Sequence, residues 1–433
     1  MSLSKPAKNL TRRTFNRLMG GLTVATAGQG LALGPAIAGG ARPKAVIIGG
    51  GAAGATAAVY LARNFPDLDI TLIEANPLYT ACFFSSRYLG GFKPLDFITH
   101  EYGALKKYGI RVVHAFAAAI DAGKKSVLLK DGTRIPYDRL IAAPGIDFKF
   151  DQIEGYDETA AAVIPHAYKA DAQIAVLRKQ LLAMEDGGVF AIASPLRPYR
   201  CPPAPYERVS IVAHYLKTHK PKSKILILDS KDEFPMSEVM TDIWTRKYSD
   251  MVEWVPAEFS GHIKAVDVKT RTLISNEERY SVQVANVIPN QHAAKIAHIS
   301  GLTDKSGWCP VDPMTFESAL APGVHMIGDA IDPGDMVKSA YSAHSQARAC
   351  AAAVGAMLNG KSPAEAGLLG STCFFLVSPE SGVQLGGTYK SDGKRLTGQS
   401  GFISQAGEAP SIRRKTAEDG DAWYASIIKD MFG

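Results

Sequence analysis

Several short motifs are missing from this sequence, and each absence removes a class of function. The five cysteines are widely spaced, so neither the C-x-x-C of a thioredoxin-like site nor the C-x-x-C-H that attaches haem occurs. His100-Glu101 has no second histidine at the zincin spacing, and the ten histidines show no metal-ligand pattern, so we expect no metal site. The sequence has no repeat of fixed period, which excludes solenoids and propellers.

An excess of basic charge is also absent once the first 38 residues are set aside. Residues 1–38 carry five of the 48 lysines and arginines and no acid, so the rest has 43 basic against 42 acidic residues. This balance offers no basic patch for nucleic acid. Beyond residue 38 no apolar run approaches the ~18 residues that a membrane-spanning helix needs, so we expect no membrane insertion.

A glycine-rich turn near the start of the remaining chain predicts a dinucleotide-binding unit. Residues 44–49 (KAVIIG) predict a buried strand, residues 55–64 a helix, and residues 69–74 (DITLIE) a second strand that ends on an acid. The turn between the first strand and the helix is a G-x-G-x-x-G with Gly49, Gly51, Ala53 and Gly54. Gly49 permits the tight turn, Gly51 the approach to a pyrophosphate, and Gly54 the packing of helix on strand. Glu74 is expected to bind the adenosine ribose.

A later segment indicates which dinucleotide is bound. Residues 323–330 (GVHMIGDA) predict a strand that ends in Gly328-Asp329. This segment, the Asp-Gly hairpin at 131–132 and the strand at 138–145 resemble the flavoprotein reductases with two dinucleotide domains, over about residues 44–354. The resemblance implies FAD, with Asp329 on its ribityl chain.

A helix predicted from Asp335 to Ala353 follows this motif. Lys338 would lie in its first turn, where a lysine and a helix N-terminus can stabilise negative charge on a reduced flavin. The alternative for Lys338 is an ordinary surface lysine.

The middle of the chain lacks a second glycine-rich turn. The strand predicted at 188–194 is followed by residues 195–207 (PLRPYRCPPAPYE), which contain no glycine. Prolines fix backbone angles and remove N–H donors, so this segment cannot cradle a pyrophosphate. A further strand at 224–229 (KILILD) indicates that the Rossmann-like scaffold persists. We therefore predict no nicotinamide site, which disfavours an NADH-dependent disulfide reductase.

Three cysteine segments extend the resemblance. Residues 201–208 (CPPAPYER) and 371–377 (STCFFLV) closely resemble the two redox-cysteine segments of the flavocytochrome c sulfide dehydrogenase flavoprotein subunit. The resemblance implies a redox-active disulfide between Cys201 and Cys373 over the flavin. It also implies that Cys82 carries FAD through a thioether to the flavin 8-methyl carbon, and that a c-type cytochrome subunit is the partner. Glu207 could move a proton or tune a thiol.

Other readings of these cysteines stay open. Cys201 and Cys373 could form a purely structural disulfide. Cys82 could pack as a free thiol beside noncovalent FAD, or could pair with Cys309 or Cys350, because spacing does not assign connectivity. The alternative functions are a sulfide:quinone oxidoreductase and a catalytically silent flavin-binding subunit.

Residues 1–38 have the features of an export signal. Arg12 and Arg13 precede a weakly apolar stretch from Leu18 to Ala38 that ends in small residues suited to signal-peptidase cleavage. The twin-arginine route suits a protein that takes up its cofactor before export, so we expect a periplasmic protein. A short membrane anchor is the alternative.

The predicted fold is α/β, with two Rossmann-like dinucleotide-binding domains (glutathione-reductase-like) and a C-terminal α+β interface domain. Residues 43–150 and 290–360 would form the FAD-binding domain, residues 151–289 the second domain without a nicotinamide site, and residues 361–433 the interface domain. Trp423 and Tyr424 are candidates for lining the flavin pocket. The predicted function is a periplasmic FAD-dependent sulfide dehydrogenase. Sulfide would attack the disulfide, electrons would pass through FAD to the cytochrome, and sulfur or polysulfide would form.

Overall fold

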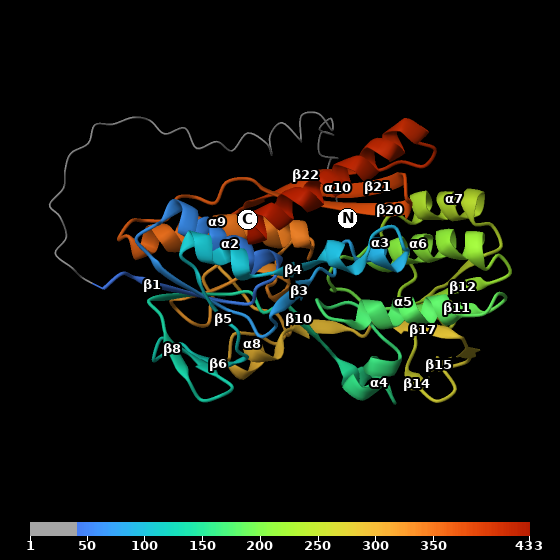
Figure 1. Ribbon diagram of the computed structural model, residues 1–433, viewed down its shortest axis with the longest axis horizontal. Helices are drawn as coiled ribbons and strands as arrows, with labels where there is room; N and C mark the ends of the chain where they lie inside the picture. The colour runs from blue at the N-terminus through green and yellow to red at the C-terminus, as the bar shows by residue number, and fades with distance from the viewer. Residues whose placement is uncertain (1–40) are drawn as a thin grey trace, which may run out of the picture.

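The computed structural model describes residues 41–433, so the predicted export signal lies outside the described residues. Within residues 41–433, no helix combines the length and the apolarity that crossing a membrane requires. The main apolar core includes residues from the N-terminal, middle and C-terminal parts, such as Val46, Ile192, Phe375 and Ile427, and two smaller clusters lie beside it. The N-terminal, middle and C-terminal parts therefore pack together as one body (Figure 1).

The first parallel sheet has five strands in the order β19-β9-β1-β2-β5. Its strands are β1 (Lys44–Ile48), β2 (Asp69–Ile73), β5 (Arg111–Val113), β9 (Arg139–Ala142) and β19 (Val324–Met326). Near-continuous apolar strands of this kind are typical of a sheet covered on both faces. The helices α2 (Ala52–Asn64) and α9 (Ala340–Leu358) contact each other and pack on this sheet. Small residues in α2 allow that close approach.

The second parallel sheet has four strands in the order β13-β12-β11-β17. Its strands are β11 (Val189–Ser194), β12 (Lys224–Asp229), β13 (Val252–Val255) and β17 (Val284–Val287). The helices of this domain are α5 (Gln173–Ala183), α6 (Ala204–His219) and α7 (Ser237–Lys247). The antiparallel pair β10 (Ile146–Phe148) and β18 (Gln291–Ala293) links the two halves where the chain crosses between them. Two Rossmann-like domains are present, so the fold prediction is confirmed.

The C-terminal part lies across both domains. An antiparallel sheet of β20 (Leu369–Ser378), β21 (Ser381–Ser391) and β22 (Leu396–Ile403) leads into the helix α10 (Pro410–Phe432). Strand β20 contacts α6 of the second domain and α9 of the first, while α10 contacts β21 and α2. Figure 1 shows this red layer covering both domains. A residue on β20 is thereby carried to the boundary between the two domains.

The remaining elements are short. They are β3 (Leu78–Thr80), α3 (Ser85–Leu89), β4 (Thr99–Glu101), β6 (Ala117–Asp121), β7 (Ser126–Leu129), β8 (Arg134–Pro136), α4 (Glu158–Val163), β14 (Ala265–Asp267), β15 (Thr272–Ile274), β16 (Arg279–Ser281) and α8 (Lys295–Ile299). Strands β7 and β8 form the predicted Asp-Gly hairpin. Helix α3 and strands β3 and β4 flank the segment that contains Cys82.

The helix predicted from Asp335 begins later, at Ala340, where the side chain of Ser339 caps it. The backbone N–H of Asp335 donates to the carbonyl of Leu396 at 2.9 Å, so residue 335 is bonded to β22 before the helix starts. Lys338 therefore precedes the helix, and the prediction that it lies in the first turn is wrong. A contact with a distant strand determined this boundary, and the local sequence does not contain that information.

Candidate functional site

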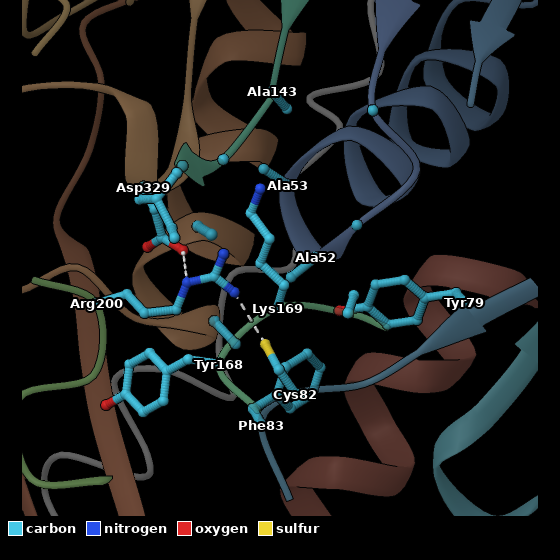
Figure 2. A pocket seen from close by; sticks show the side chains of 18 of the residues that line it. Ala52, Ala53, Tyr79, Cys82, Phe83, Ala143, Tyr168, Lys169, Arg200 and Asp329 are labelled. Carbon is cyan, nitrogen blue, oxygen red and sulfur yellow. Dashed lines mark hydrogen bonds and ion pairs between the residues drawn. The ribbon is translucent and has the colours of Figure 1, made fainter. Parts of the chain in front are cut away.

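A cavity of about 710 Å³ lies where the two domains and the C-terminal layer meet. Ligand pockets typically enclose about 300–1,000 Å³, so this volume suits a large organic cofactor. The site residues that line it are Gly49, Gly51, Ala53, Glu74, Cys82, Cys201, Glu207, Gly328, Asp329 and Cys373. Figure 2 shows the part of the cavity around Cys82 and Asp329. Residues predicted from five separate motifs thus come together at one place.

The glycine-rich turn has the geometry of a dinucleotide-binding unit. Gly49 adopts φ +91°, and a Cβ there would lie 2.4 Å from the carbonyl oxygen of Ala143. A Cβ at Gly54 would lie 1.8 Å from the carbonyl oxygen of Gly49, so this residue lets α2 pack against the turn. A Cβ at Gly51 would meet nothing closer than 3.7 Å, which leaves space for a ligand. Because no side chain caps α2 at Gly51, its N-terminal N–H groups suit a pyrophosphate.

Glu74 follows β2 and lies beside this turn. Its Oε2 accepts a hydrogen bond from the backbone N–H of Gly50 at 2.7 Å, and its Oε1 accepts one from the N–H of Asn76 at 2.9 Å. A carboxylate oxygen has two lone pairs, so acceptor capacity remains for ribose hydroxyls. The two backbone bonds fix the carboxylate at the cavity wall.

Asp329 supplies a test of whether a flavin fits. Its Oδ1 is buried and has no hydrogen-bond partner among residues 41–433. Buried polar atoms without partners are rare in folded proteins, so an orphan acceptor at a cavity wall indicates a ligand donor. A ribityl hydroxyl is such a donor. Gly328 lies next to it with φ +76°, and a Cβ there would lie 3.2 Å from the Cβ of Ala53. The residues present therefore fit a flavin dinucleotide.

The structure does not bring Lys338 to this cavity. Its ammonium donates to the carbonyls of Asp329, at 3.1 Å, and of Ile331, and lies 3.6 Å from the centre of the Trp308 ring. Burial lowers the pKa of Lys338 to about 8. Its side chain is thus neither on the surface nor among the cavity-lining residues. The N-terminus of α9, with Ser339 and Ala340, takes the place expected for the lysine.

Cys201 and Cys373 meet in the cavity although they are far apart in the sequence. Cys201 precedes α6 in a left-handed conformation, φ +48°, and its N–H donates to the carbonyl of Lys338 at 2.7 Å. Cys373 lies on β20. A hydrogen bond with Cys373, followed by burial, raises the pKa of the Cys201 thiol well above its usual range. The two sulfurs are thus within hydrogen-bonding reach of each other.

Glu207 is buried behind Cys201 in the first turn of α6. Its Oε2 accepts from the hydroxyl of Ser86 and its Oε1 from the backbone N–H of Leu376, both at 3.0 Å. Burial raises its pKa, while the nearby Arg87 opposes that effect. The charge of Glu207 is also one of the causes that raise the pKa of Cys201. The carboxylate therefore joins all three parts of the protein and acts on the thiol electrostatically.

Cys82 lines the cavity in the loop between β3 and α3. Its sulfur accepts a hydrogen bond from Nη1 of Arg200 at 3.0 Å. Cys309 and Cys350 are fully buried elsewhere in the core, and neither lines the cavity. Burial raises the pKa of Cys309 to about 12 and also raises that of Cys350. Cys82 therefore lies with the candidate cofactor residues rather than beside those two thiols.

The two aromatic candidates of α10 separate in the structure. Trp423 lines the cavity and stacks on Tyr341, with ring centres 5.3 Å apart. Tyr424 is not among the cavity-lining residues. It stacks on Phe84 at 4.6 Å, and its hydroxyl donates to the carbonyl of Phe97. One helical step thus turns Trp423 toward the cavity and Tyr424 into the packing behind it.

Sequence reasoning missed several residues of the cavity wall. Arg200, Tyr168 and Lys169 line the cavity together with the cysteines (Figure 2). Arg200 stands next to Cys201 in the sequence, which was the only signal available for it. Tyr168 and Lys169 belong to a loop without a motif, and only the fold brings them there.

Comparison with known families now decides the assignment. The model for the central part of the sulfide dehydrogenase (flavocytochrome c) flavoprotein chain matches residues 174–289. The flavin-binding model of flavocytochrome c sulphide dehydrogenase matches residues 365–432. The chain belongs to the flavocytochrome c sulfide dehydrogenase flavoprotein family. The pyridine nucleotide-disulphide oxidoreductase model also matches residues 43–182.

Individual proteins that match this chain share only a modest sequence identity with it. Mitochondrial sulfide:quinone oxidoreductase of Dictyostelium discoideum is 23% identical over 66% of this chain and 65% of its own length. Sulfide-quinone reductase of Aquifex aeolicus is 30% identical over 30% of each chain. The matches thus span less than two thirds of either relative.

Solved structures share the fold. The sulfide:quinone oxidoreductase of Aquifex aeolicus has a TM-score of 0.71 at 15% identity, covering 90% of this chain and 91% of its own. A ferredoxin reductase of Rhodopseudomonas palustris has a TM-score of 0.61 at 18% identity, covering 79% and 82%.

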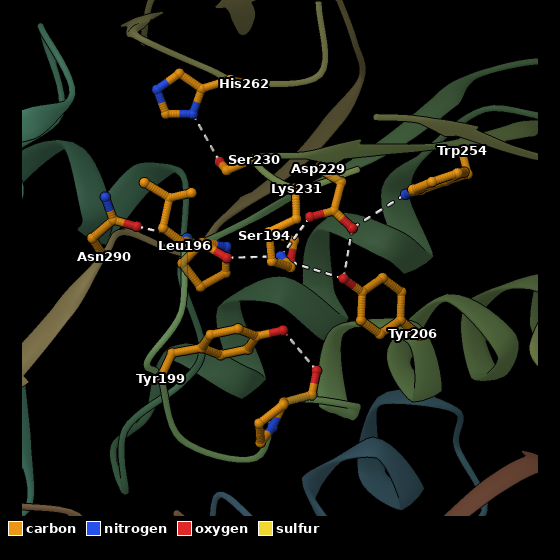
Figure 3. A network of polar contacts seen from close by, with 12 residues as sticks. Ser194, Leu196, Tyr199, Tyr206, Asp229, Ser230, Lys231, Trp254, His262 and Asn290 are labelled. Carbon is orange, nitrogen blue, oxygen red and sulfur yellow. Dashed lines mark hydrogen bonds and ion pairs between the residues drawn. The ribbon is translucent and has the colours of Figure 1, made fainter. Parts of the chain in front are cut away.

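In this member of the flavocytochrome family, the second domain has a closed polar network where a nicotinamide dinucleotide would bind. Asp229 ends β12, the position that Glu74 takes after β2, but it is fully buried. Its carboxylate accepts from Tyr206 at 2.6 Å, Lys231 at 2.5 Å and Trp254 at 3.1 Å (Figure 3). The hydrogen-bonding capacity of Asp229, the acid that would bind a ribose, is thus taken up by side chains of the protein itself. This geometry supports the predicted loss of the nicotinamide site.

Replacing Lys231 with methionine is expected to destabilise the protein by about 3–5 kcal/mol, because the buried charge of Asp229 loses its ion-pair partner. Denaturant unfolding measures the loss, and the flavin spectrum of the folded variant should not change. Lys222→Met is the matched control, because Lys222 is exposed and lies just before β12, the strand that Lys231 follows. Equal stability of the two variants would contradict the structural role given to Lys231.

The thiol pair predicts a pH effect in the reduced protein. A raised pKa leaves little thiolate on Cys201 at neutral pH, so alkylation by iodoacetamide should be slow there and accelerate only at alkaline pH. Cys373→Ala removes the largest cause of that shift, so the acceleration should move to lower pH. Mass spectrometry of the Cys201 peptide across a pH series measures both profiles. Identical profiles would show that Cys373 does not act on Cys201.

Proposed function

We propose that this protein is a periplasmic FAD-dependent sulfide dehydrogenase that passes electrons to a c-type cytochrome subunit. Membership of the flavocytochrome c sulfide dehydrogenase family supports a flavin and a reduced sulfur substrate. The observation that carries the proposal is the contact between Cys201 and Cys373 in the cavity that also holds the dinucleotide turn and Asp329. We propose further that FAD is bound covalently through Cys82.

The chemistry begins with the oxidised cysteine pair. Hydrosulfide attacks one sulfur of the Cys201–Cys373 disulfide, the S–S bond breaks, and the other sulfur leaves as a thiolate. The attacked cysteine then carries the substrate sulfur as a persulfide. Overall the substrate loses one proton and two electrons and becomes zero-valent sulfur, released as sulfur or polysulfide. When bound, FAD supplies the two-electron acceptor and passes the electrons on singly to the cytochrome.

Residues around the pair support this sequence of events. Glu207 is a buried carboxylate with a raised pKa, which suits a group that takes up the proton from the substrate. Its two hydrogen bonds, from Ser86 and Leu376, keep it in place through the reaction. The missing glycine-rich turn and the internal pairing of Asp229 support sulfide rather than NADH as the source of electrons.

An anaerobic titration of the purified protein tests the function. Sulfide should bleach the visible absorbance of the oxidised flavin, whereas NADH should leave it unchanged. Acid precipitation of the same sample should leave the flavin with the protein if Cys82 holds it covalently. A flavin spectrum indifferent to sulfide would overturn the proposal and favour a catalytically silent flavin-binding subunit.

A sulfide:quinone oxidoreductase is the second candidate, because the matched relatives carry that name. The electron acceptor distinguishes the two. Sulfide-reduced protein mixed with oxidised c-type cytochrome should reoxidise quickly and reduce the haem, whereas a soluble quinone should react slowly. The reverse preference would assign the chain to quinone reduction. The same experiment, run with the cytochrome as sole acceptor, also tests the proposed partner.

A further inference from the structure

Arg200 connects parts of the cavity that belong to different motifs. Its Nη1 donates to the sulfur of Cys82 at 3.0 Å, and its Nε lies 3.3 Å from Oδ2 of Asp329 in an ion pair. Figure 2 shows the guanidinium between these two groups. We propose that Arg200 is the positioning residue for covalent attachment of the flavin to Cys82. This inference rests on the proposed function, which includes that attachment.

The backbone around Arg200 is held on several sides. Its N–H donates to Oε1 of Gln291 on β18 at 2.9 Å. The next residue, Cys201, is held through its N–H by the carbonyl of Lys338 and through its carbonyl by the hydroxyl of Tyr168 at 3.0 Å. The side chain of Arg200 is only 15% exposed. A long side chain that starts from a fixed backbone and is largely buried places its guanidinium reproducibly.

The charge and shape of the guanidinium suit this role. Arginine keeps its proton at any physiological pH, so it stabilises negative charge on the sulfur without competing for the proton. Its fork reaches a sulfur and a carboxylate together, which the point charge of lysine cannot do as well. Hydrogen bonds with a charged partner are about twice as strong as neutral ones.

Two other basic side chains of the cavity wall have different partners. Lys169 pairs with Asp147. Arg208 donates to Asn286 at 2.6 Å and to the carbonyl of Ala167 at 2.8 Å. Among the hydrogen bonds of residues 41–433, the one that reaches the Cys82 sulfur comes from Arg200. The guanidinium of Arg200 is therefore the cationic group in position to act on that sulfur.

Attachment forms one bond and releases two protons and two electrons. A C–S bond forms between the Cys82 sulfur and the flavin 8-methyl carbon. One proton leaves the methyl group and one leaves the thiol, while an electron pair stays on the flavin ring system. Dioxygen or a one-electron acceptor such as a c-type cytochrome then removes those two electrons. Arg200 contributes by orienting the sulfur and by stabilising its negative charge before the bond forms, because the thiolate is the nucleophile.

The test follows covalent incorporation directly. Full-length chain is incubated with FAD in air, samples are acid-precipitated over time, and flavin fluorescence of the protein band on a denaturing gel gives the covalent fraction. Arg200→Gln is expected to slow attachment about tenfold or more, consistent with loss of one charged hydrogen bond. Arg200→Lys should fall between Arg200→Gln and the natural chain. Arg197→Gln, an exposed position in the same loop, is the matched control and should behave as the natural chain.

Cys82→Ser is the negative control, because it should form no covalent flavin and should still bind FAD noncovalently. Attachment in Arg200→Gln at the natural rate, or no covalent flavin in the natural chain, would overturn the proposal. Loss of noncovalent FAD from both Arg200 variants would also overturn it, because Arg200 would then act in binding. A separate measurement tests whether sulfide bleaches the noncovalently bound flavin of Cys82→Ser. A negative result there would count against the proposed function and leave the attachment result standing.

Discussion

The Cys373→Ser variant is expected to keep its flavin and lose at least roughly a thousandfold in the rate of flavin reduction by sulfide. Serine cannot form the disulfide that hydrosulfide attacks, and it leaves Cys201 without its sulfur partner. The side chains are nearly equal in size, and Cys373 lies on a strand whose backbone pairing does not depend on sulfur. Stopped-flow absorbance under anaerobic conditions measures the effect.

Two controls make that result specific to the pair. Cys201→Ser should show the same loss, because both sulfurs are required. Cys350→Ala changes a buried cysteine of α9 outside the cavity, so it should retain rapid reduction by sulfide even if its stability falls. Rapid reduction of Cys373→Ser would mean that sulfide reaches the flavin without a cysteine pair. The disulfide would then be structural, as one of the alternative readings holds.

Two alanine substitutions in the glycine-rich turn are expected to fail in different ways. In Gly54→Ala the new Cβ would lie 1.8 Å from the carbonyl oxygen of Gly49, and a backbone oxygen cannot move away cheaply. Overpacking of this kind costs about 1–3 kcal/mol and sometimes more. In Gly51→Ala the nearest atom is 3.7 Å away, so the chain should fold normally. Its methyl group would instead occupy the approach of the pyrophosphate, and FAD binding should weaken at least tenfold.

The comparison is best made in the Cys82→Ser background, where FAD binding is reversible and a Kd can be measured. Thermal unfolding of the apoprotein reports stability, and fluorescence titration reports affinity. Gly54→Ala should lower the Tm of the apoprotein, and Gly51→Ala should leave it unchanged while raising Kd. Normal FAD affinity in Gly51→Ala would mean that the pyrophosphate does not lie against this turn. That result would remove the strongest geometric support for a dinucleotide in this cavity.

Features that depend on local backbone chemistry could be predicted from the sequence. The glycines of the first turn, the acid after the second strand and the prolines of the Cys201 loop each restrict a few consecutive residues. Such restrictions operate wherever the segment lies in space, so both Rossmann-like units and the absence of a second glycine-rich turn could be predicted. The Cys201–Cys373 pair was placed through a resemblance and not through spacing, since spacing leaves connectivity open.

Several features depend on partners that are distant in the sequence, and these could not be predicted from local patterns. Lys338 looked suited to a helix N-terminus, but contact of residue 335 with β22 delays the helix and carbonyl oxygens take the ammonium. Asp229 looked like the end of an ordinary strand, yet packing surrounds it with Tyr206, Lys231 and Trp254. Arg200 reaches Cys82 only because two domains meet at the cavity. These outcomes follow from long-range packing, which brings together side chains whose local sequences carry no information about each other.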